Sequence, residues 1–330
     1  MYNPLHHRPL PRPALTGAVS AAIATIALVG ATGAIAQQET SSEPLGQVKV
    51  GQEAGQITYW VLPGPRVLDP DVFGTADEPK ITLKPKIKTA KEAPGPPTVP
   101  ELLKNVPILV AAPVMARKTT PDGKLVFAQP TPFSDDARII QGEFEATLTD
   151  MVDTDPPGKP GETPDTGEFE ASFTDPAGNE YRVELDHVVK PPFPGYETQG
   201  GVMLDSAHHG STGTGSPLMP EVKTHAAFWG VGNLFINGEK VDDHRVMHLM
   251  TTEVVRNKDY ELVHGDDLPL GPEERHIRDQ EHHTHLMMPP VKGSPKGPVF
   301  SPVPTAFELP NGKHQPFIHV MWEQDRIETP

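Results

Sequence analysis

Prolines and glycines are the feature of this chain that most limits its fold, since 40 prolines and 29 glycines occur among its 330 residues. Proline breaks helix interiors by removing a backbone donor, and glycine weakens them. Between these residues lie short stretches in which polar and apolar side chains alternate, which is the period of a half-buried strand. The sequence therefore predicts an all-β protein, either an antiparallel β-sandwich or an open barrel.

Two stretches show this alternation most clearly, because residues 142–150 (GEFEATLTD) nearly repeat as residues 167–175 (GEFEASFTD). We expect them to be neighbouring strands of one antiparallel sheet. The sequence DPAGN at residues 175–179 predicts a turn that starts a hairpin. The pair Asn237-Gly238 predicts a second hairpin, because Asn-Gly favours the tight turns that connect antiparallel strands.

The first 36 residues are expected to be a signal peptide and not part of the fold. A basic start without acidic residues precedes an apolar run from Ala14 to Gly33, and Ala34-Ile35-Ala36 has the form of a cleavage site. A single membrane anchor is the alternative, since the run approaches the ~20 residues needed to span a bilayer. The sequence thus predicts a periplasmic or secreted protein with no membrane span after signal cleavage.

The remainder is expected to divide in two. Residues 37–100 are predicted to be a Pro-rich N-terminal arm or linker, because their last ten residues (KEAPGPPTVP) have the composition of a linker. Residues 101–330 would form the β-sandwich domain, with a C-terminal half rich in His and Met. The absence of cysteine excludes disulfides and, for an exported chain, favours a bacterial periplasm or exterior.

Charge and motif content exclude several kinds of partner. With 28 basic and 44 acidic residues the formal net charge is −16, so we expect no nucleic-acid partner, which would need a basic surface. The Gly-rich stretch at residues 208–215 lacks the Lys of a phosphate loop, so no nucleotide cofactor is expected. A chain without cysteine also has no haem-attachment motif and no Cys-based zinc site.

Histidine and methionine are concentrated in the C-terminal half. Twelve of the fifteen histidines lie at or after His208, and seven of the ten methionines at or after Met203. Imidazole binds copper, zinc and iron, and a soft thioether favours Cu(I), so this combination points to copper with zinc as second choice.

Strand periodicity selects the candidate ligands, because alternate residues of a strand share a face. It groups His244 with His248 and Met250, and His319 with Met321, and it places His225 where it could converge with them. His283 and His285, spaced i, i+2, form a second cluster. The predicted metal ligands are His225, His244, His248, Met250, His283, His285, His319 and Met321.

Other interpretations remain open. A strand histidine is often an ordinary core or surface residue, and methionine is a common core filler. The chain would then be a structural or partner-binding envelope protein, with the Pro-rich arm as the segment that binds the partner. A metal-dependent periplasmic enzyme is a third possibility, and it needs three ligands and an open coordination position. No residue pattern assigns catalytic residues.

Overall fold

The structure is a computed structural model that describes residues 43–68, 75–78, 117–134, 136–152, 161–190, 201–208, 222–253, 282–292 and 299–329. Every regular element within these ranges is a β-strand, and all the strand pairs are antiparallel, which confirms the predicted fold class. None of the described stretches forms an apolar helix of membrane-spanning length. The predicted signal peptide and the linker at residues 91–100 lie outside the described residues and stay predictions.

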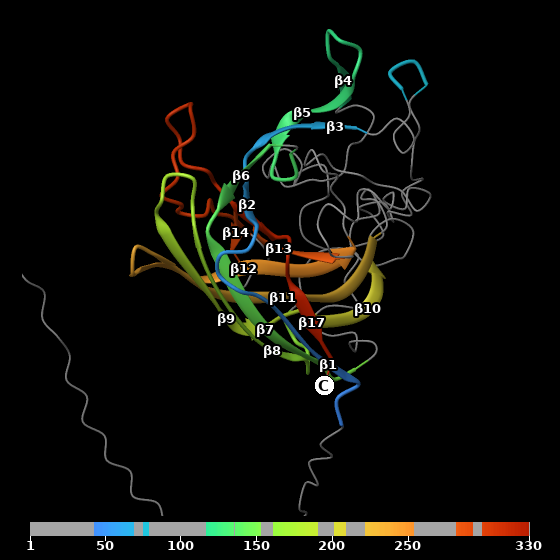
Figure 1. The fold of residues 1–330 in the computed structure, drawn as a ribbon, viewed down its shortest axis with the longest axis vertical. Helices are drawn as coiled ribbons and strands as arrows, with labels where there is room; N and C mark the ends of the chain where they lie inside the picture. The colour runs from blue at the N-terminus through green and yellow to red at the C-terminus, as the bar shows by residue number, and fades with distance from the viewer. Residues whose placement is uncertain are drawn as a thin grey trace, which may run out of the picture. The chain divides into compact units, whose positions relative to one another are not determined.

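The main sheet has fourteen strands (Figure 1). In spatial order its strands are β17 (Arg326–Glu328), β1 (Gly46–Gln52), β7 (Gly142–Asp150), β8 (Thr166–Thr174), β9 (Glu180–Val188), β11 (Val222–Ile236), β12 (Glu239–Glu253), β13 (His282–Met288), β16 (Ile318–Trp322), β2 (Thr58–Val61) and β6 (Ala137–Ile140). Three further strands are attached to this path, with β10 (Val202–His208) beside β11, and β14 (Val291–Lys292) between β12 and β15 (Val299–Phe300). A separate three-stranded sheet contains β3 (Gly64–Val67), β5 (Leu125–Thr131) and β4 (Arg117–Thr119).

The main sheet curls into a half-barrel, and Figure 1 shows the strands changing direction between β7–β9 and β11–β13. Only Gln141 separates β6 from β7, so the last strand of the path runs directly into its third strand. β1 and β2 belong to this sheet although they lie in the stretch expected to be an arm. Two of the three strands described in that stretch are therefore part of the main sheet, whereas β3 belongs to the separate three-stranded sheet.

Local turn chemistry fixes the hairpins. The two near-repeats form β7 and β8, which pair from Gly142↔Phe173 to Thr149↔Thr166 as expected. The turn between β8 and β9 is held by the Asp175 carboxylate, which accepts hydrogen bonds from the backbone N–H groups of Ala177 and Asn179.

The hairpin between β11 and β12 turns at the predicted Asn-Gly pair. Asn237 and Gly238 have φ values of 50° and 84°, the positive values that a two-residue hairpin turn requires. The turn sets the register of the two longest strands, and β12 carries part of the candidate site described below.

One face of the curled sheet carries the main hydrophobic core. Trp60 is fully buried there, and its ring lies 6.2 Å from Phe173, 5.4 Å from Tyr181 and 5.9 Å from Phe307. The Trp60 indole N–H donates a hydrogen bond to Gln315 Oε1 over 3.1 Å. We call this face the inner face and the opposite one the outer face.

Gly232 of β11 provides a test of this packing. A Cβ atom added to it would lie 2.1 Å from the Glu184 carbonyl oxygen and 2.3 Å from Met247 Cε. We expect Gly232→Ala to lower the free energy of unfolding by about 1–3 kcal/mol, since the neighbouring backbone must move. Urea denaturation measures the change. Gly46→Ala is the control, because its Cβ meets only the end of the Leu204 side chain, and an equal loss in both variants would contradict the prediction.

Candidate metal centre

Strand register gathers six imidazole and thioether side chains on the outer face of β12, β13 and β16. They form two adjacent rows across these strands, His248–Met287–His319 and Met250–His285–Met321. Directly paired residues share a face and have Cβ atoms about 4.5–5.5 Å apart. The two side-chain types therefore alternate both along and across the strands. We call these six residues the His/Met patch.

The patch is buried although it lies opposite the main core. His319 and Met321 are each 1% exposed and His248 is 8% exposed, whereas His285 is only partly buried. Met321 packs with Val61 and Tyr59 of β2. The donor atoms are thus largely shielded from water, and His285 is the imidazole nearest to solvent.

Backbone carbonyl groups fix the orientation of two imidazoles in the patch. His248 Nδ1 lies 2.8 Å from the Phe228 carbonyl oxygen, and His319 Nδ1 lies 2.6 Å from that of Pro132. Because a carbonyl oxygen can only accept, Nδ1 carries the proton in both rings and Nε2 holds a lone pair. Metal-binding histidines are typically oriented in this way, through a hydrogen bond from the other ring nitrogen.

The charge state of His248 also suits a metal ligand. Burial lowers the pKa of His248 to about 3, so its ring is neutral at pH 7. Trp229 stacks on this ring, with centroids 4.1 Å apart and planes inclined by 7°. A neutral, immobilised imidazole is the form that binds a metal ion.

The imidazoles of β13 and β16 lie close together. The His285 ring centre is 5.6 Å from that of His319 and 5.9 Å from that of His283. Two imidazoles that bind one ion tetrahedrally, through bonds of about 2.0–2.1 Å, have ring centres roughly 5 Å apart. Among the described residues, no three or more His, Asp, Glu or Cys side chains together have the geometry to hold a metal. The structure offers pairs of imidazoles flanked by thioethers.

His283 occupies the next position along β13, opposite Thr252 of β12. It is fully buried, and its Nδ1 lies 3.5 Å from Oε2 of Glu323, which is itself 2% exposed. His283 therefore borders the patch and lies beside a buried carboxylate.

His244 does not join the patch. Its φ of 48° interrupts the strand alternation that would have placed it beside His248. The side chain is 74% exposed and lies near the Asp243 carboxylate, 3.5 Å away. The expectation that His244 shares a face with His248 is therefore wrong, because it assumed unbroken alternation along β12.

His225 does not join the patch either. The pairing of β11 with β12 shifts register between Thr224 and Ala226, so His225 is the extra residue of a bulge. Its ring lies 5.5 Å from that of His282, away from the patch. The predicted convergence of His225 with His248 and His319 is wrong for this reason.

His225 and His282 belong to a separate polar cluster with Asp325. The Asp325 carboxylate is fully buried and accepts a hydrogen bond from Thr284 Oγ1 over 2.6 Å. His282 Nδ1 lies 3.3 Å from the same carboxylate oxygen. These contacts join β13 to the segment that follows β16.

The sequence interpretation missed His208 and Met203 of β10. His208 is fully buried, and its Nε2 lies 2.9 Å from Met203 Sδ. Placing His208 in a Gly-rich loop obscured its position at the end of a strand. The run Val202-Met203-Leu204 was the available signal, because it indicates a strand that could extend to His208.

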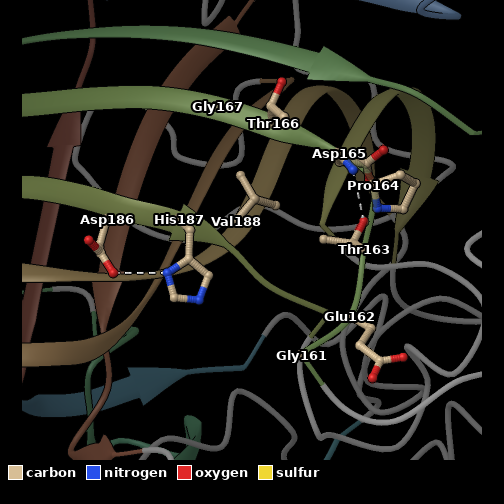
Figure 2. Close-up of a pocket in the computed structure, with 10 residues that line it drawn as sticks. All are labelled: Gly161, Glu162, Thr163, Pro164, Asp165, Thr166, Gly167, Asp186, His187 and Val188. Atoms are coloured by element: carbon tan, nitrogen blue, oxygen red, sulfur yellow. Dashed lines mark hydrogen bonds and ion pairs between the residues drawn. The ribbon is translucent and has the colours of Figure 1, made fainter. Parts of the chain in front are cut away.

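A pocket of about 630 Å³ lies away from the patch, between residues 161–167 and residues 186–188 (Figure 2). Figure 2 shows His187 beside Asp186, with Nδ1 2.9 Å from Oδ2. Burial raises the pKa of Asp165, although its carboxylate accepts backbone hydrogen bonds from Met151 and Val202. Asp165 therefore holds three segments together, and none of the predicted metal ligands lines this pocket.

A scan against protein-family models, a search of curated proteins and a search of solved structures each found no match to this chain.

Proposed function

We propose that this protein is an exported, non-catalytic β-protein that binds copper as Cu(I) through the His/Met patch. The observation that carries the proposal is the pair of adjacent rows in which imidazole and thioether alternate on one buried face. The role that suits such a protein is storage, delivery or sensing of the metal. Zinc is the second choice of ion.

The donor set favours copper over zinc. Thioether sulfur is a soft ligand that selects Cu(I), whereas structural zinc sites use thiolate, imidazole and carboxylate. Burial adds a second reason. A monovalent ion loses less hydration energy than a divalent one when it enters a site of neutral ligands shielded from water.

The first site is centred on His285, His319 and Met321, with Met287 beside them. His319 is oriented by the Pro132 carbonyl group, and Met321 is a buried thioether directly opposite His285. His285 is partly exposed, so it is the ligand that an incoming ion would meet first. The alternation of donor types lets an ion take two imidazoles and a thioether from only two strands.

Export rests on the sequence of the first 36 residues and on the lack of cysteine. The lack of cysteine also bears on the ligands, because a copper protein with no thiolate must use imidazole and thioether groups.

Removing single ligands from the first site should weaken copper binding. We expect His285→Ala and Met321→Leu each to lower Cu(I) affinity at the first site at least tenfold, because even outer-shell partners of a ligand are worth about 10–100-fold. Met321→Leu nearly conserves side-chain volume and should cost the fold less than about 1.5 kcal/mol. Anaerobic titration of the purified protein with Cu(I), in competition with a chromogenic chelator, measures the affinity.

His244→Ala is the matched control, since this histidine is exposed and lies outside the patch. It should leave Cu(I) affinity unchanged, and Zn(II) should compete poorly with Cu(I). A wild-type protein that takes up neither metal would overturn the proposal. It would favour a structural or partner-binding protein in which these histidines make ordinary packing contacts.

A further inference from the structure

The row Met250–His285–Met321 continues on the other side of β12, first onto β11 and then onto β10. Met250 pairs with Ala227, and Ala227 pairs with Met203. Ala227 has only a methyl side chain, so the longer thioethers on either side can approach each other above it. Met203, Ala227 and Met250 pack in one buried cluster against which Trp229 also packs. Two thioethers from non-adjacent strands are therefore brought together on the outer face.

His208 places an imidazole beside the first of these thioethers. Its Nε2 lies 2.9 Å from Met203 Sδ, and its Nδ1 lies 3.4 Å from Ser206 Oγ. Burial lowers the pKa of His208 to about 4, so the ring is neutral at pH 7. Because a thioether sulfur can only accept, the contact with Met203 places the ring proton on Nε2 in the metal-free protein. In the other tautomer Nδ1–H donates to Ser206 Oγ, and Nε2 would then offer its lone pair to an ion beside the sulfur.

His248 supplies a second imidazole on the same side. Its Nδ1 proton is bound by the Phe228 carbonyl oxygen, and its Nε2 has no hydrogen-bond partner although the residue is 92% buried, being 8% exposed. A buried polar atom without a partner is costly, and a bound ion would satisfy it. Trp229 holds the ring by parallel stacking and so limits the directions in which Nε2 can point.

We propose that His208, Met203, Met250 and His248 form a second Cu(I) site, distinct from the one at His285, His319 and Met321. The identity of the ion rests on the proposed function, since both sites offer neutral imidazole and thioether donors. The two sites are neighbours, because Met250 of the second is paired directly with His285 of the first. An ion that enters at the partly exposed His285 therefore has a buried second site one strand away.

The number of Cu(I) ions bound tests this second site. The wild-type protein should bind two ions, and Met203→Leu should bind one while keeping the affinity of the first site. His285→Ala combined with Met321→Leu should also bind one, with the remaining ion lost when Met203→Leu is added. X-ray absorption at the copper edge should show fewer sulfur neighbours per protein in Met203→Leu.

The outcomes separate this inference from the proposed function. Suppose that the wild type binds a single ion, which is lost in His285→Ala combined with Met321→Leu but retained in Met203→Leu. That result would overturn the second site and support the first. Two ions in Met203→Leu would likewise overturn the second site, and no ion in the wild type would overturn both. Trp229 emission gives an independent measurement, because binding of the second ion should change it in the wild type and not in Met203→Leu.

Discussion

Lowering the pH from 7 to 4 should remove about 6 kcal/mol of stability from the metal-free protein through two buried histidines, an amount comparable to the whole stability of many domains. Two fully or almost fully buried histidines cause this effect. Burial lowers the pKa of His208 to about 4 and that of His248 to about 3. In the unfolded chain the same side chains titrate near the ordinary pKa of about 6.5.

The direction follows from the proton balance. Below about pH 6.5 the unfolded chain binds a proton on each histidine, while the folded protein does not. The contribution of the two histidines to the free energy of unfolding is therefore complete above about pH 6.5. It is lost as the pH falls towards their folded-state pKa values. Each histidine contributes a slope of about 1.4 kcal/mol per pH unit in this interval.

Urea denaturation at a series of pH values, with metal removed, measures the slope. His248→Gln should reduce it by about 1.4 kcal/mol per pH unit between pH 6.5 and 4. His187→Gln is the matched control, because the His187 side chain is 57% exposed and is neither of the two buried histidines. Identical slopes in the wild type and in His248→Gln would contradict the assignment of a buried neutral imidazole.

Trp60→Ala should lower the free energy of unfolding by about 3–5 kcal/mol, the usual cost of removing a large buried aromatic side chain. Trp60 is fully buried and contacts three aromatic rings from different parts of the chain. It also anchors β2, which lies directly beside β16 and thus supports the strand that carries His319 and Met321.

Two further variants separate the contributions to this loss. Trp60→Phe keeps most of the apolar surface but leaves Gln315 Oε1 without the indole donor, which should cost about 1–3 kcal/mol. Ile139→Ala on the neighbouring strand removes a side chain that is 70% exposed and should change stability by less than about 0.5 kcal/mol. A Trp60→Ala loss no larger than that of Ile139→Ala would contradict the central role of this ring.

The fold class and the hairpins could be predicted because their signals are local. Asn237-Gly238 and residues 175–179 each specify a turn, and the near-repeats at residues 142–150 and 167–175 alternate without interruption. The pairing of β2 with β16 could not be predicted. Tertiary packing around Trp60 decides that these two strands, so distant along the chain, pair with each other. No pattern in a single sequence indicates that packing.

The candidate site could likewise be predicted only in part. Alternation placed His248 with Met250 and His319 with Met321 on shared faces, and the structure has both pairs on the outer face. It failed at His225, where a bulge adds a residue to the strand. It also failed at His244, where a positive φ interrupts the alternation and the side chain is exposed. Histidine is among the non-glycine residues enriched at positive φ, but most histidines have a negative φ, so its presence at position 244 was too weak a signal to predict the irregularity.

The position of β16 between β13 and β2 determines when the proposed copper sites could form. β2 lies near the start of the described chain and β16 near its end, so the sheet cannot close until residue 322 is available for pairing. Such long-range pairing makes folding slow and late. If the chain is exported in extended form, as proposed, both proposed copper sites would be completed only after it has crossed the membrane, and the compartment in which it folds would decide which metal it meets.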